Sequence, residues 1–179
     1  MIFLARHGET TYNAERRFQG WSPKAVLTEK GIAQAHELAD AAAREETAFV
    51  ALYASPLERA RQTAAIVGER LGLEPVVDGR FAETETGEWT DVRYDDVDPA
   101  LFEAWRHAGD GFRYPGGESL NEQQERVIAG LVDVTQRGDL PALVICHRGT
   151  IRVALCHTRQ RGLDAFSEID VPNGGLVRL

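Results

Sequence analysis

The sequence is poor in cysteine and has no long apolar run. Its two cysteines, Cys146 and Cys156, are too few for a disulfide framework, so we expect a reducing compartment. No apolar run reaches the length of a transmembrane helix. The start of the chain, residues 1–6, lacks a basic region, and its apolar run is too short for a signal peptide. We therefore expect a cytoplasmic protein without a membrane partner.

Positive charge is also scarce. The 20 lysines and arginines stand against 28 aspartates and glutamates, which gives a net charge of −8 at pH 7. This acidity argues against nucleic acid and anionic membranes as partners. It does not exclude a small anionic substrate, because the local field in a cleft can oppose the global charge. The length of 179 residues predicts one domain (1–179), and no internal repeat or linker divides it.

Apolar runs and helical patterns alternate along the chain. Strands are predicted at 2–5, 49–54, 75–77 and 142–146, and edge strands at 166–171 and 175–179. Helices are predicted at 28–44, 55–71, 99–108 and 119–137, and another is expected to follow residues 147–150. The segment 11–20 is expected to be a loop. The alternation predicts an α/β fold, a three-layer α/β/α sandwich with a mostly parallel central sheet.

Capping signals mark three of the helix starts. Thr28 is the expected N-cap of the first long helix. Ser55 with Glu58 predicts a capping box, and Ser119 with Glu122 predicts a second one. The buried stripe of the first long helix is predicted to be Ile32, Ala35, Leu38, Ala39 and Ala42.

Polar residues whose side chains can bind anions or act as nucleophiles follow three of the predicted strands. Arg6, His7 and Gly8 come directly after the first strand, and His147 follows the strand at 142–146. Arg59 lies at the helix start after the strand at 49–54, where backbone N–H groups attract anions. If these strands are neighbours, two imidazoles and two arginines converge at the carboxyl edge of the sheet. That arrangement is an anion site with a candidate nucleophile.

Seven short motifs occur between residues 2 and 152. They are Arg6-His7-Gly8-Glu9-Thr10-x-x-Asn13, Phe18-Gln19-Gly20, Leu27-Thr28-Glu29-Lys30-Gly31-x-x-Gln34-Ala35, Ser55-Pro56-Leu57-x-Arg59-Ala60-x-x-Thr63-Ala64, Glu83-x-x-x-Gly87-x-Trp89, Pro115-Gly116-Gly117-Glu118-Ser119 and His147-x-Gly149-x-Ile151-Arg152. In this order they resemble the motifs of the histidine phosphatase superfamily, in its phosphoglycerate-mutase-like branch. The resemblance implies a phosphoglycerate mutase-like fold.

The resemblance also implies catalytic roles. His7 would be the nucleophile that becomes phosphohistidine, and Glu83 would protonate the leaving group. The phosphoryl oxygens would be clamped by Arg6, Arg59 and His147. Arginine can neutralise phosphoryl charge without a metal, so we expect neither metal nor cofactor.

Four further residues complete the predicted phosphate- and substrate-binding set: Asn13, Gln19, Gly20 and Arg148. Arg148 is a departure, because members of the family commonly have Ser-His-Gly where this chain has Cys-His-Arg at 146–148. The family's usual Asp is also missing between Gly20 and Leu27. Both departures leave the substrate open and affect specificity more than the core chemistry. An aromatic group is expected to line the substrate pocket: Trp21, Phe102, Trp105, Phe112 and Tyr114.

Two other enzyme classes remain open. Cys146-x-x-Gly149-x-x-Arg152 is similar to the phosphate loop of cysteine-dependent tyrosine phosphatases, in which a thiolate attacks the phosphorus. That alternative leaves the motif at 6–8 and Arg59 unexplained. Phosphoglycerate mutases are the second alternative, but they are typically longer, with segments that enclose the site. Here only 99–117 could form a short lid, which favours hydrolysis.

The sequence thus favours a metal-independent phosphomonoesterase acting on a small phosphorylated metabolite. A non-enzymatic binding module would be expected to have lost the nucleophile, whereas His7 is present. Whether the chain forms a homo-oligomer is left open.

Overall fold

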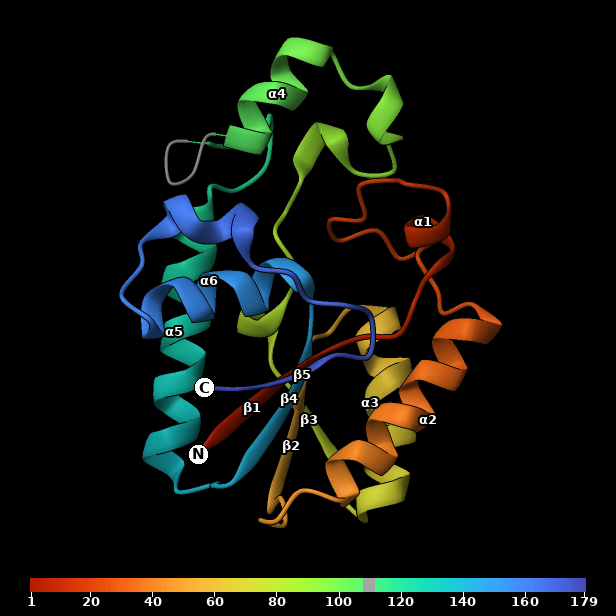
Figure 1. Ribbon diagram of the computed structural model, residues 1–179, viewed down its shortest axis with the longest axis vertical. Helices are drawn as coiled ribbons and strands as arrows, with labels where there is room; N and C mark the ends of the chain where they lie inside the picture. Colours follow the sequence, from red (N-terminus) through yellow and green to blue (C-terminus); the bar gives the residue numbers. More distant parts are fainter. Residues whose placement is uncertain (108–111) are drawn as a thin grey trace.

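The computed structural model describes residues 1–107 and 112–179, and its centre is a five-stranded sheet in the order β3-β2-β4-β1-β5 (Figure 1). The strands are β1 (Ile2–Arg6), β2 (Ala51–Ala54), β3 (Pro75–Val77), β4 (Ala142–Cys146) and β5 (Leu176–Arg178). The first four run parallel, and β5 lies antiparallel to β1 at one edge. The mostly parallel sheet is confirmed.

Helices cover both faces of this sheet (Figure 1). The four long ones are α2 (Glu29–Ala43), α3 (Glu58–Leu71), α5 (Leu120–Arg137) and α6 (Arg148–Thr158). Successive strand residues point to opposite faces, so Phe3 and Ala5 pack toward α2 and α3, whereas Ile2 and Leu4 pack toward α5 and α6. Strands that are buried on both sides need continuous apolar sequence, as β1 and β4 have. The three-layer α/β/α architecture is confirmed.

The predicted helix starts differ in how well they match the structure. Thr28 caps α2 by accepting the N–H of Gly31, and Ser119 with Glu122 forms the predicted capping box of α5. The prediction that Ile32 belongs to the buried stripe of α2 is wrong. This residue is 44% exposed, and the buried stripe begins one position earlier. The other four residues of that stripe are buried: Ala35, Leu38, Ala39 and Ala42.

The predicted capping box at Ser55 is wrong. Helix α3 begins at Glu58 with Leu57 as its N-cap, and no side chain caps it. The hydroxyl of Ser55 instead accepts the N–H of Leu57 and lies 2.7 Å from Nε2 of His147. The hydroxyl therefore bonds to Leu57 and to His147, which follows β4, and not to the first turn of α3.

Two shorter segments also differ from expectation. The expected loop at 11–20 contains a short helix, α1 (Thr11–Ala14), with a capping box between Thr10 and Asn13. The edge strand predicted at 166–171 is wrong, because 163–168 forms a 3-10 helix, η5 (Leu163–Glu168), which packs on α6. The edge strand predicted at 175–179 is confirmed as β5.

An aromatic cluster lies outside the two sheet-facing cores. Phe18, Trp89 and Tyr114 form its buried part, and partly buried rings pack against them. Two of these rings, Phe102 and Trp105, belong to α4 (Pro99–His107), which lies at the top of the molecule in Figure 1. The possible lid at 99–117 thus contains α4, while its residues 108–111 lie outside the described residues.

The remaining short elements are the 3-10 helices η1 (Gly79–Phe81), η2 (Gly87–Trp89) and η3 (Tyr94–Asp96). None of the helices in the described part of the chain is long and apolar enough to cross a bilayer.

Candidate active site

The carboxyl ends of β1 and β4 lie side by side and bring two histidines together. Arg6 pairs with Cys146 in the parallel register, and the backbone N–H of His7 donates to the carbonyl of Cys146 over 3.1 Å. The rings of His7 and His147 follow directly, with centroids 5.1 Å apart at an angle of 60°. Both side chains are buried. Strand pairing therefore places two imidazoles at one point on the sheet edge.

The tautomer of His7 is determined by its own loop. Nδ1 lies 2.7 Å from the carbonyl oxygen of Gly8. Because a carbonyl only accepts, Nδ1 carries the proton and Nε2 keeps its lone pair. Burial, and then the charges of Arg59 and Arg6, hold the pKa of His7 well below its usual value. The ring is therefore neutral at physiological pH, with Nε2 able to act as a nucleophile.

His147 is oriented by Ser55. The Ser55 hydroxyl accepts the Leu57 N–H and has no other acceptor for its own hydrogen among the described residues, so we assign that hydrogen to Nε2 of His147. The ring proton of neutral His147 then belongs to Nδ1, which is buried and has no hydrogen-bond partner among the described residues. Burial, followed by the charge of Arg59, lowers the pKa of His147. His147 can thus offer Nδ1–H as a neutral donor.

Two buried arginines lie beside the histidines. Arg59, the second residue of α3, is wholly buried, and its Nη2 donates to the carbonyl of Gly20 over 2.8 Å. Nη1 of Arg6 donates to the carbonyl of Val171 over 2.7 Å. Nε of both arginines and Nη1 of Arg59 have no partner in the described part of the chain. Burial lowers the pKa of each arginine to about 10. Fixed, charged and incompletely paired donors are suited to bind an anion.

Glu83 is held by hydrogen bonds to its carboxylate. Oε1 accepts from the N–H of Thr84 over 2.9 Å and from the amide of Gln123 over 3.3 Å, and Oε2 accepts the N–H of Gly149 over 3.2 Å. A Cβ on residue 149 would collide with Oε1, so only glycine permits this approach. The carboxyl group is thereby positioned beside the start of α6.

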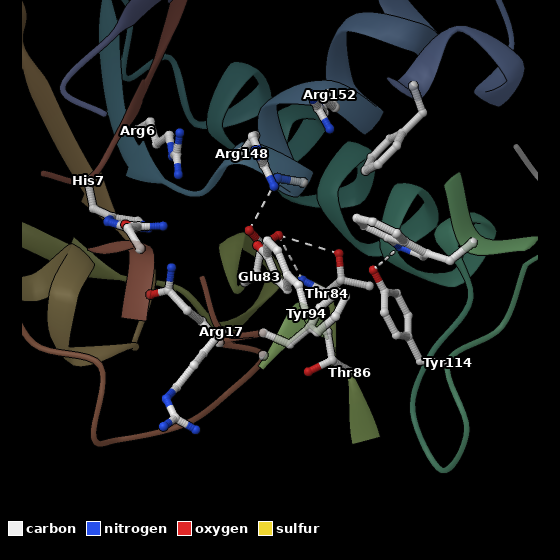
Figure 2. Close-up of a pocket in the computed structure, with 17 residues that line it drawn as sticks. Arg6, His7, Arg17, Glu83, Thr84, Thr86, Tyr94, Tyr114, Arg148 and Arg152 are labelled. Carbon is white, nitrogen blue, oxygen red and sulfur yellow. Dashed lines mark hydrogen bonds between the residues drawn. The ribbon is translucent and has the colours of Figure 1, made fainter. Parts of the chain in front are cut away.

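These groups surround a cavity of about 60 Å³ (Figure 2). Four of the predicted binding residues line it: Asn13, Gln19, Gly20 and Arg148. Arg6, His7 and Glu83 line it as well, whereas Arg59 and His147 are wholly buried and do not belong to the lining. Several lining residues were given no site role in the histidine-phosphatase interpretation of the sequence: Arg17, Thr84, Thr86, Tyr94, Arg152 and Phe166. Arg152 belongs to the motif at 147–152, which was a signal that could have revealed it.

The predicted aromatic pocket lining divides into two groups. Trp105 and Tyr114 line the cavity. Phe102 and Phe112 do not line it and pack within the aromatic cluster. Trp21 also lies outside the lining: it is 46% exposed, and its indole N–H donates to the backbone carbonyl of Glu83.

The end of the chain also reaches the site, which the sequence did not indicate. The side-chain amide of Asn173 donates to the carbonyl of His7 over 3.2 Å and to Oδ1 of Asn13 over 3.1 Å. The N–H of Gly174 donates to the carbonyl of Arg6. These bonds hold the loop that begins at His7 against the segment before β5.

Cys146 has a different environment. Its side chain is wholly buried in the core that α5 and α6 cover, and burial raises the pKa of its thiol. Among the described residues, no group of three or more His, Cys, Asp or Glu side chains could hold a metal ion.

Comparisons with known proteins agree with this geometry. A family model of the histidine phosphatase superfamily (branch 1) matches residues 2–179. A probable phosphoglycerate mutase GpmB from Enterobacter sp. (strain 638) is 38% identical over 150 residues, which cover 80% of this chain and 67% of that protein. The protein of the same name from Yersinia pestis (strain Pestoides F) is 37% identical over 149 residues, with the same shares of both chains.

Solved structures are similar over almost the whole chain. The mycobacterial glucosyl-3-phosphoglycerate phosphatase in complex with VO3 is 27% identical, with a TM-score of 0.89, and the match covers 98% of this chain and 90% of that one. A phosphoglycerate mutase from Thermus thermophilus is 34% identical, with a TM-score of 0.76 and coverage of 98% and 90%.

Proposed function

Because this chain belongs to the histidine phosphatase superfamily, branch 1, we propose that it is a metal-independent phosphomonoesterase that acts through a phosphohistidine on a small phosphorylated metabolite. The observation that carries the proposal is the hydrogen bond from Nδ1 of His7 to the carbonyl of Gly8. It leaves the lone pair of a neutral imidazole on Nε2, beside Arg6 and Arg59.

In the first step, Nε2 of His7 attacks phosphorus. An N–P bond forms and the bond between phosphorus and the ester oxygen breaks. Glu83 enters this step in its protonated form and gives that proton to the departing oxygen. The charge on the phosphoryl oxygens is met by the guanidinium group of Arg6, which lines the cavity, and by the unpaired donors of Arg59 and His147, which are buried beside His7.

In the second step, water attacks the phosphohistidine. Glu83, now ionised, takes a proton from the water, an O–P bond forms and the N–P bond breaks. Inorganic phosphate leaves, and Nε2 of His7 recovers its lone pair. Glu83 is protonated again, so the cycle is complete without a metal.

The environment of Cys146 argues against the cysteine-dependent alternative. A thiol attacks as its thiolate, and burial raises the pKa of this one. Its side chain belongs to the core under α5 and α6, whereas His7 lines the cavity. The cysteine mechanism would therefore need a buried thiolate that faces away from the site.

Mutase activity is the second candidate, because relatives that are 37–38% identical are named probable phosphoglycerate mutases. A mutase returns the phosphoryl group to an organic hydroxyl, and a phosphatase gives it to water. The two reactions share the first step, so both are consistent with the residues around His7.

A panel of phosphorylated metabolites, assayed for phosphate release with phosphoglycerate isomerisation measured in parallel, tests the proposal. We expect phosphate release to exceed isomerisation for every substrate that is turned over. Isomerisation that outruns phosphate release would assign the chain to the mutases instead.

A further inference from the structure

The lining of the active-site cavity is strongly positive in a chain that is acidic overall. It contains four arginines, Arg6, Arg17, Arg148 and Arg152, and a single carboxylate, Glu83. Arg17 is paired with a glutamate outside the lining, at 2.6 Å. In the described part of the chain, the other three form no ion pair within 4.0 Å. The phosphoryl group accounts for Arg6, which leaves two cations without a role.

These two cations stand side by side. Arg148 and Arg152 are the first and fifth residues of α6, so they lie one turn apart on the same face of the helix. Figure 2 shows Arg6, Arg148 and Arg152 along one side of the pocket, with Glu83 facing them. Like charges at this spacing destabilise a helix unless an anion compensates them. The two arginines are therefore placed so that both can bind one anionic group.

Arg148 and Arg152 lie between two cavities. Arg148 and Arg152 line the inner cavity of about 60 Å³ and also an adjoining outer cavity of about 490 Å³. His7, Arg6 and Glu83 line only the inner one. The inner space is small beside the outer one, so we place the phosphoryl group inside and the body of the substrate outside. A substrate that joins the two must pass the pair.

The guanidinium group of Arg152 is held in place before any ligand binds. Its Nε donates to the carbonyl of Ile169 over 2.6 Å, and its Cζ lies 5.2 Å from the centroid of the Phe166 ring. Tyr94, Trp105 and Phe166 line both cavities and form aromatic walls that strengthen charge interactions by excluding water. Fixing the donor in advance reduces the entropy lost on binding.

We infer that Arg148 and Arg152 bind a second anionic group, a carboxylate or a phosphate, on the same molecule whose phosphate ester His7 attacks. This inference rests on the proposed function and narrows its substrate class to phosphate monoesters with two anionic groups. The planar guanidinium binds both kinds of oxyanion through paired N–H donors.

Matched substrate pairs test the inference. 3-Phosphoglycerate and glycerol 3-phosphate share a three-carbon skeleton and differ in the carboxylate. Fructose 1,6-bisphosphate and fructose 6-phosphate differ in the second phosphate. For each pair, the ratio of the two kcat/KM values measures the effect of the second anion, and a partly misfolded variant lowers both members equally.

We expect the wild-type ratio to favour the member that carries the second anionic group in at least one pair. That ratio should fall roughly 10- to 100-fold in Arg148→Gln and in Arg152→Gln, because each removes a charge-assisted hydrogen bond. The loss should lie mainly in KM, and Arg148→Lys should recover part of it. Arg159→Gln, at the exposed end of α6 and outside both cavities, is the matched control and should leave the ratio unchanged.

The substrate pair whose kcat/KM ratio falls in the arginine variants identifies the second anionic group as a carboxylate, a phosphate or both. A wild-type ratio near one for both pairs, or ratios that survive in both glutamine variants, would overturn the inference. Calorimetric binding of the same four compounds to His7→Ala keeps the test separate from turnover. If no substrate is hydrolysed, the proposed function fails, while the binding preference and its loss in the arginine variants still decide the second-anion site.

Discussion

The hydroxyl of Ser55 lies 2.7 Å from Nε2 of His147 and connects the ends of β2 and β4 across the candidate active site. Ser55 is wholly buried, as is His147. With the hydroxyl assigned as the donor to Nε2, the ring proton of His147 lies on Nδ1, where it can meet a phosphoryl oxygen. Ser55 is therefore a positioning residue for the phosphoryl site.

Replacement of Ser55 by Ala should lower kcat by roughly tenfold, about the effect of one lost hydrogen bond of 1–1.5 kcal/mol. It should also destabilise the fold, because a buried acceptor loses its partner. Ser119→Ala is the matched control, since it removes the hydroxyl that caps α5 and Ser119 does not line the cavity. That control should reduce the free energy of unfolding by about 0.5–2 kcal/mol and leave kcat unchanged. Equal effects on kcat in both variants would remove the positioning role.

The acid role of Glu83 is tested by the leaving group. Glu83→Gln should slow the hydrolysis of alkyl phosphates by roughly 10²–10⁴-fold, the usual loss for a general acid. It should slow p-nitrophenyl phosphate much less, because nitrophenolate departs without protonation. Glu85→Gln, a neighbouring carboxylate outside the cavity lining, is the control. Equal losses on both substrates would exclude Glu83 as the acid, and a leaving-group-dependent loss in Glu85→Gln would transfer the role.

The buried histidines make stability depend on pH. Burial first, and then Arg59, lower the folded-state pKa of both His7 and His147 below the unfolded value of about 6.5. Their contribution to stability is therefore full above about pH 6.5 and declines as the pH falls toward the folded pKa values. Each histidine can add a slope of at most about 1.4 kcal/mol per pH unit.

Urea unfolding at several pH values between 5.0 and 7.5 measures this slope. The free energy of unfolding of the wild-type protein should decrease as the pH is lowered from 7.5 to 5.0. The decrease should be less steep in His7→Gln and His147→Gln. A slope that is the same in all three proteins would mean that neither histidine is neutral in the fold.

Metal independence is a separate prediction. The cations around the phosphoryl group come from arginine, and no metal-binding group of side chains occurs among the described residues. Activity after treatment with a strong chelator should equal the untreated activity, and added Mg²⁺ or Zn²⁺ should not increase it. A strict requirement for a divalent ion would contradict the proposed mechanism.

Local sequence patterns were sufficient to predict the position of a residue that lies at the end of a predicted strand or the start of a predicted helix. Arg59 could be placed at the start of α3, and His7 and His147 at two strand ends, because strand and helix boundaries are short-range signals. Ser55 was misassigned, because a Ser-Pro-x-Glu pattern looks the same whether or not a distant histidine takes the hydroxyl. The exposed Ile32 shows that helical spacing defines a stripe only to within one position.

The contributions of the last 30 residues were the hardest to foresee. Asn173 and Val171 hold the loop at His7 and the guanidinium of Arg6 through bonds between residues more than 160 positions apart. Such contacts depend on the path of the chain after α6, and no local pattern encodes that path. The 3-10 helix η5 was read as a strand for the same reason, since it is shaped by packing on α6.

Trapping the phosphoenzyme tests the central claim most directly. The protein is mixed with a ³²P-labelled phosphate monoester, quenched within one turnover, and the labelled peptide is identified by mass spectrometry. We expect an acid-labile, base-stable label on His7 that also forms in Cys146→Ser and is absent from His7→Ala. A label on Cys146, or turnover that persists in His7→Ala while Cys146→Ser is inactive, would contradict a phosphohistidine mechanism.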